Sequence, residues 1–60
     1  MSTAIRLLIY KKLMQARIVL DEYQVHRIEK HVENEVSRGY DVVLVIDDVI
    51  LTLNGGGNES

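Results

Sequence analysis

The sequence predicts a small α+β domain, made of two helices followed by a C-terminal β-hairpin. Residues 3–38 contain neither glycine nor proline and are rich in residues that favour helix. Gly39 then interrupts the chain, and two short runs of β-branched and aliphatic residues follow it. This order of elements, with a glycine between the helical and the extended parts, is the basis of the predicted fold class.

The middle of the chain carries clear signals for a helix over residues 22–38. Asp21 is suited to the N-cap, and Gln24 follows at the spacing of a capping box. Gly39 is suited to the left-handed position just beyond the helix end. Apolar residues recur every three or four positions and form one stripe: Val25, Ile28, Val32 and Val36.

Residues 3–19 are predicted to form the first helix, with two apolar faces. One face consists of Ile5, Ile9, Leu13, Ala16 and Leu20. The other consists of Leu7, Tyr10, Met14 and Ile18. Strands at 4–10 and 16–20 are an alternative, but the residues between them supply no turn former. A second alternative fuses both helical segments into one rod, and the cap at Asp21 argues against it.

Residues 42–46 and 49–53 are predicted to be the two strands of a hairpin, joined by Asp47 and Asp48. One face of this hairpin pairs Leu44 with Leu51, so we expect an aspartate at either position to unfold the domain. We expect Asp48→Gly to be neutral or stabilising, because a two-residue turn favours residues with positive φ.

Both faces of the hairpin are apolar, and a two-stranded ribbon is marginal by itself. The chain has 60 residues and no cysteine, so it lacks both a large core and a disulfide. We therefore expect the sheet to be completed in a homodimer. The expected interface residues are Leu7, Tyr10, Met14, Ile18, Val43, Val45 and Ile50.

The chain is predicted to be a single domain over residues 1–54 with a flexible tail over 55–60, because the glycine-rich tail has little to bury. Charges interrupt every apolar run, so no membrane span is expected. With no cysteine and no secretory signal, the expected compartment is the cytoplasm.

No motif indicates catalysis, a cofactor or a metal. His26 and His31 are five positions apart, so they lie on different faces of a helix and cannot bind the same metal ion. Asp47 and Asp48 read as a solvated turn, because no further acid or base is placed near them by sequence. We therefore expect a protein that is not an enzyme and binds no cofactor.

Charge is unevenly distributed, although the formal net charge is −2. Residues 1–20 carry basic side chains and no acidic ones, which makes nucleic acid a candidate partner. The candidate contacts are Arg6, Lys11, Lys12 and Arg17.

The favoured hypothesis is a non-enzymatic, homodimeric protein–protein interaction module. Small chains of this size are common among phage and mobile-element proteins that regulate or inhibit a larger protein. The alternative is a dimeric, nucleic-acid-binding transcriptional regulator that uses the N-terminal basic residues. Net negative charge and the scatter of those residues around the helix favour the first hypothesis.

Overall fold

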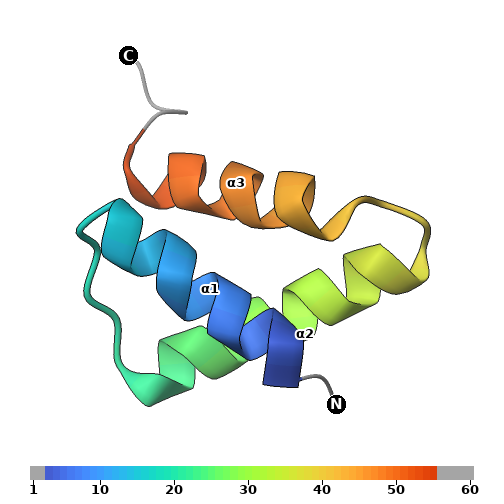
Figure 1. The fold of residues 1–60 in the computed structure, drawn as a ribbon, viewed down its shortest axis with the longest axis horizontal. Helices are drawn as coiled ribbons and strands as arrows, with labels where there is room; N and C mark the ends of the chain where they lie inside the picture. Colours follow the sequence, from blue (N-terminus) through green and yellow to red (C-terminus); the bar gives the residue numbers. More distant parts are fainter. Residues whose placement is uncertain (1–2, 56–60) are drawn as a thin grey trace.

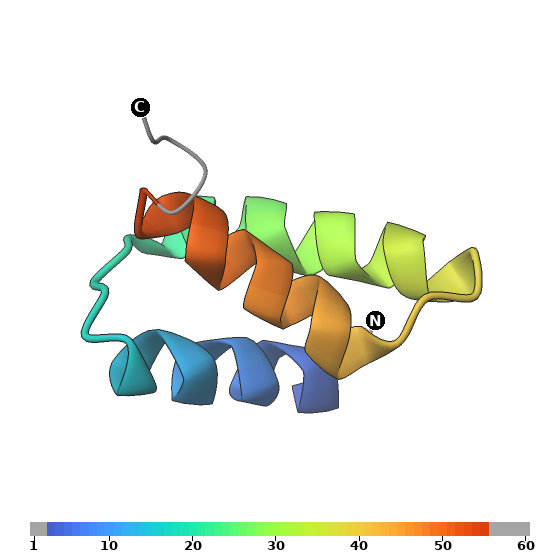
Figure 2. The same ribbon diagram turned by 90° about the horizontal axis from the view of Figure 1, so that it is seen from above.

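The computed structural model describes residues 3–55, and within that range it contains three helices and no strand. They are α1 (Thr3–Gln15), α2 (Glu22–Ser37) and α3 (Val42–Leu53). Each helix packs against the other two. In Figure 1, α1 crosses in front of α2 and α3 lies above them. Figure 2 shows α3 between α1 and α2 when the molecule is seen from above, and the three helices form a bundle.

The prediction of an α+β fold with a C-terminal hairpin is wrong, because residues 42–53 form the single helix α3. Asp41 caps this helix: its Oδ2 accepts hydrogen bonds from the backbone N–H groups of Val43 and Leu44, both at 3.1 Å. Asp47 and Asp48 lie in the middle of the helix rather than at a turn. With no sheet in the described chain, the expected completion of a sheet in a homodimer is wrong as well.

Packing explains why this β-rich segment is helical. An isolated hairpin would leave two unpaired edges and one uncovered face. As a helix, the segment places Ile46 fully inside the core and lays Val42, Val45 and Ile50 against it. The preference of valine and isoleucine for strands is weak, and tertiary packing overrides it.

The prediction for the middle helix is confirmed. The Gln24 backbone N–H donates to Asp21 Oδ1 at 2.8 Å, and Gln24 Oε1 accepts from the Asp21 backbone N–H at 3.4 Å. These two bonds form the predicted capping box. The helix ends at Ser37, one residue before the predicted end, and Gly39 adopts a left-handed φ of 103° beyond it.

The N-terminal segment is helical as predicted, and the strand and single-rod alternatives are ruled out. α1 ends at Gln15, earlier than expected, because Arg17 turns the chain with a φ of 59°. The Arg17 N–H donates to Met14 O at 3.0 Å, and the Ile18 N–H donates to Leu13 O at 2.9 Å. These two bonds form a Schellman motif, in which an arginine occupies the position that glycine usually takes.

The core is small and lies where the three helices meet. Ile9 and Leu13 come from the first of the two faces predicted for α1. Leu44 and Leu51, predicted to be core residues of a hairpin, are instead 68% and 57% exposed. The buried apolar residues are Ile9, Leu13, Val25, Val32 and Ile46.

The described helices share one core. Of the tail predicted over residues 55–60, Gly55 has a left-handed φ of 78° just beyond α3. Residues 56–60 lie outside the described part of the chain.

Candidate protein interaction surface

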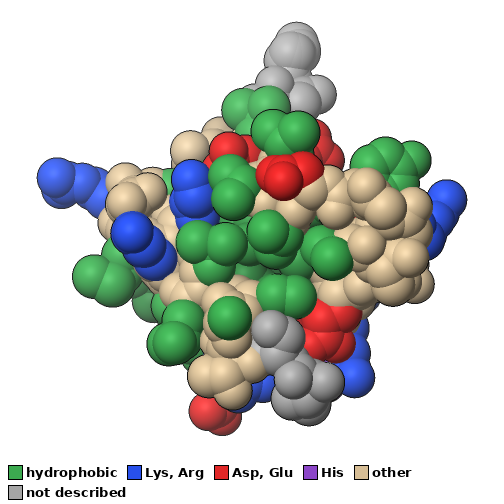
Figure 3. Space-filling model, turned by 45° about the vertical axis from the view of Figure 1, so that its right-hand side comes forward, with side chains coloured by type: hydrophobic (Ala, Val, Ile, Leu, Met, Phe, Trp, Pro, Cys, Tyr) green, Lys and Arg blue, Asp and Glu red, His purple; other side chains and the backbone are tan. Residues whose placement is uncertain are grey.

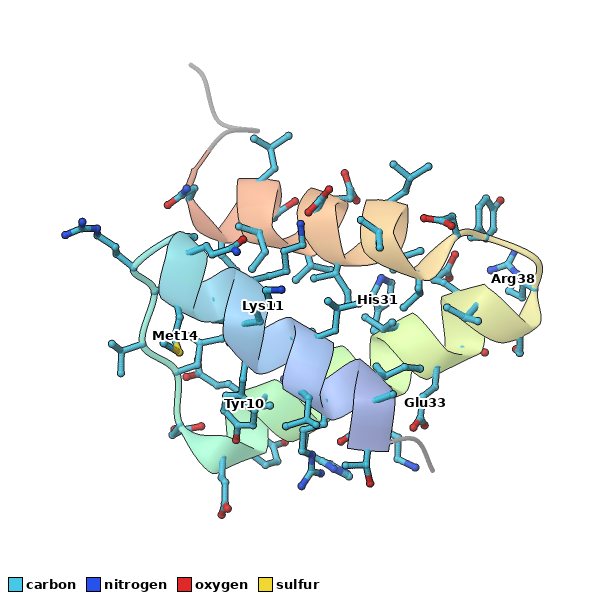
Figure 4. All side chains as sticks on the ribbon, viewed as in Figure 1. Tyr10, Lys11, Met14, His31, Glu33 and Arg38 are labelled. Carbon is cyan, nitrogen blue, oxygen red and sulfur yellow. The ribbon has the colours of Figure 1, made fainter. Side chains whose placement is uncertain are left out.

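The outer face of α1 is apolar for most of its length. Leu7 is 63% exposed, Tyr10 39% and Met14 78%. Leu7 and Met14 are two turns apart on the side of the helix opposite Ile9, whereas Tyr10 lies nearer α2 and lines a pocket with Tyr23. Figure 4 shows Tyr10 and Met14 projecting from α1 on the side away from α3.

The outer face of α3 is also apolar at both ends. Leu44 and Leu51 are seven residues apart, which is two helical turns, and both are exposed. Val43 lies partly exposed beside Leu44. Asp47 and Asp48 occupy the exposed turn between the two leucines. This face therefore alternates apolar, acidic and apolar along the helix.

The outer face of α2 differs, because it is polar apart from Tyr23. Its exposed polar residues are Glu22, Gln24, His26, Arg27, Lys30, His31, Asn34 and Ser37. A helix with one apolar stripe and one polar face is typical of a surface helix that faces water. The apolar surface of the molecule is thus concentrated on α1 and α3.

The space-filling view shows exposed hydrophobic side chains on one face of the molecule (Figure 3). Figure 3 shows hydrophobic side chains gathered in the middle of one face of the molecule. Lys and Arg side chains lie to the left of this area, and Asp and Glu side chains lie above it. An exposed apolar area with charges of both signs around it is typical of a protein interaction site.

The predicted interface residues fall into two groups. Leu7, Tyr10, Met14 and Val43 lie exposed on outer faces. Three others pack, partly buried, against the core: Ile18, Val45 and Ile50. Ile18 belongs to the second apolar face of the predicted first helix, which ends earlier in the structure. Val45 and Ile50 belong to the predicted strands, which are helical in the structure.

Leu44 and Leu51 were not among the predicted interface residues, although both lie on an outer face. The signal that would have found them is their spacing of seven residues, read as two helical turns.

One of the predicted nucleic-acid contacts, Arg6, is held in a partly buried ion pair with α2. Its Nε and Nη2 donate to Glu29 Oε1 at 3.0 and 2.6 Å. Glu29 is 1% exposed, whereas the Arg6 side chain is 43% exposed. The hydrogen bond and the negative charge of Glu29 raise the pKa of Arg6 above its ordinary value. Glu29 was not predicted as a partner, although it lies on the buried side of α2.

The other predicted nucleic-acid contacts do not gather into one patch. Lys12 pairs with Asp47 of α3 at 3.2 Å. Arg6 pairs with α2, so these two bases lie on opposite flanks of α1. Lys11 lies on the outer face of α1, and Arg17 lies beyond the end of that helix. The structure therefore does not bring the four bases together.

A groove of about 480 Å³ runs between α2 and α3. Its polar lining includes Arg27, His31 and Asp48, but no ion pair joins them in the described chain. No group of three His, Cys, Asp or Glu side chains within residues 3–55 is placed to hold a metal ion. None of the described helices combines the length and apolar character needed to cross a membrane.

The comparisons with other proteins add no further assignment: no family model, curated protein or solved structure matches this chain. The function is therefore inferred from the surface itself.

Proposed function

We propose that this chain is a non-enzymatic protein–protein interaction module that acts as a homodimer in the cytoplasm. The observation that carries the proposal is the apolar outer surface of α1 and α3. The outer face of α2 is polar apart from Tyr23. Leu7, Met14, Leu44 and Leu51 are all more than half exposed. Exposed apolar areas are typical of protein interaction sites, and these four side chains lie on two of the three described helices.

Size supports the same proposal. A chain of 60 residues buries little apolar surface by itself, and cysteine is absent, so no disulfide supports the fold. Covering the outer faces of α1 and α3 would enlarge the buried apolar surface without changing the fold. The role that fits a module of this kind is a small regulator or inhibitor of a larger protein.

Sedimentation equilibrium at micromolar concentration tests the proposal. The wild type should sediment at twice the chain mass of 6.9 kDa. Leu51→Gln should shift it towards the monomer while circular dichroism stays helical, because Leu51 is exposed and outside the core.

Val19→Gln is the matched control for this experiment. Val19 is an apolar side chain that is 94% exposed, but it lies in the connection between α1 and α2, outside the outer faces of α1 and α3. This variant should sediment like the wild type. A wild type that stays monomeric over a wide concentration range would refute the proposal.

A further inference from the structure

The outer faces of α1 and α3 share one pattern with opposite charge. On α1, Leu7, Lys11 and Met14 follow one another at spacings of four and three residues; we call this the α1 stripe. On α3, Leu44, Asp48 and Leu51 follow at the same spacings; we call this the α3 stripe. In each stripe, two apolar side chains two turns apart flank one charge.

Lys11 and Asp48, the charges of the two stripes, take no part in the ion pairs of residues 3–55. Lys12 and Asp47, next to them in sequence, pair with each other at 3.2 Å. Lys11 and Asp48 are both exposed, and neither forms an ion pair with another described residue. Lys11 and Asp48 are therefore available for ion pairs with a second molecule, on two outer surfaces of the same chain.

We propose that the α1 stripe of one copy packs against the α3 stripe of a second copy, with Lys11 beside Asp48. This inference rests on the proposed function and adds that the α1 stripe and the α3 stripe contact each other. Leucine and methionine at two-turn spacing can interdigitate across a helix–helix contact. The central Lys11–Asp48 pair then fixes the partner and the alignment, as charges do in other helical interfaces.

Charge also argues against the other pairings of the same surfaces. Two α1 stripes would bring Lys11 of each copy together. Two α3 stripes would bring Asp48 of each copy together, with Asp47 close by. Like charges across an interface are disfavoured, whereas the mixed pairing joins opposite charges.

A charge-reversal experiment tests this pairing. Lys11→Glu and Asp48→Lys should each weaken self-association at least about tenfold, because each places like charges together. An equimolar mixture of the two variants should regain the wild-type mass, since the introduced carboxylate of one variant then meets the introduced ammonium group of the other. The double variant Lys11→Glu/Asp48→Lys should regain it alone.

The control is Lys30→Glu, which reverses an exposed charge on the polar face of α2. It should self-associate like the wild type.

The outcomes separate this inference from the proposed function. If Leu51→Gln abolishes self-association but mixing the two charge variants restores nothing, the surface is right and the pairing is wrong. If the wild type itself is monomeric, the proposed function and the proposed pairing are both wrong. Restoration by mixing, with loss in each variant alone, is expected only when Lys11 and Asp48 meet across the contact.

Discussion

At the scale of single residues, the unexpected feature is Glu29, a carboxylate inside an apolar core. It lies one turn after Val25 and one turn before Val32, so the spacing alone places it on the buried side of α2. Its partner Arg6 is 23 residues earlier, on another helix. No local rule connects residues so far apart, so the sequence could not predict this ion pair.

The two members of this pair should respond differently to substitution. Arg6→Met leaves the buried carboxylate of Glu29 without its partner, which is strongly destabilising. Glu29→Met removes the buried charge and leaves Arg6, which is partly exposed, free to reach water. We therefore expect the midpoint of urea unfolding to fall further for Arg6→Met than for Glu29→Met.

The double variant Arg6→Met/Glu29→Met serves as the control, and its midpoint should lie above that of Arg6→Met. Equal loss in both single variants would show that the carboxylate is not effectively buried. The raised pKa of Arg6 means that its contribution is present at neutral pH and is lost only as pH rises through that raised value.

At the scale of helices, the predicted bounds were accurate where the prediction used capping residues. Asp21, Gln24 and Gly39 defined α2 to within one residue, because each satisfies a particular backbone group or φ value. α3 was missed because its apolar residues lie symmetrically about Asp47 and Asp48, which fits a hairpin as well as a helix. The N-cap at Asp41 was the local signal that favours helix.

The prediction of a hairpin in place of α3 also affected the predicted interface. The outer face of α1 was predicted from helical spacing, and the structure places Leu7, Tyr10 and Met14 there. On α3, strand alternation assigned Leu44 and Leu51 to a buried face. The packing of α3 against both other helices determines which of its faces is exposed, and no single segment encodes that packing.

Substitution of Asp48 distinguishes a helix from a hairpin by the sign of its effect. In the hairpin, Asp48→Gly would be neutral or stabilising. In α3 it should destabilise by about 1 kcal/mol relative to Asp48→Ala, because glycine is a poor residue in a helix interior. Both variants lose the same carboxylate, so any role of that charge in assembly cancels in the comparison. Thermal unfolding followed by far-UV circular dichroism gives the difference, and a more stable glycine variant would contradict the helix.

At the scale of the whole molecule, folding and assembly are linked. The fully buried apolar core consists of a few side chains, whereas exposed leucines and a methionine cover two outer faces. A partner that binds only the folded state stabilises it by mass action. The stability of this chain should therefore depend on its own concentration.

We expect the thermal midpoint of the wild type to rise by several degrees when protein concentration is raised tenfold. Leu51→Gln should have a midpoint that does not change with concentration, because it cannot form the contact. Scanning calorimetry at a series of concentrations measures both. A wild-type midpoint that is independent of concentration would show that folding and assembly are separate.

The two short connections, residues 16–21 and 38–41, also have a kinetic consequence. Most contacts of a small helical bundle lie within its helices and are therefore close in sequence, and such bundles fold in about microseconds to milliseconds. The chain contains no proline, so no slow cis–trans isomerisation delays any molecule. Encounter between two copies is bimolecular, and at micromolar concentration it is the slower step. Newly made chains should therefore be complete bundles before they meet, and the Lys11 and Asp48 surfaces should recognise each other already formed.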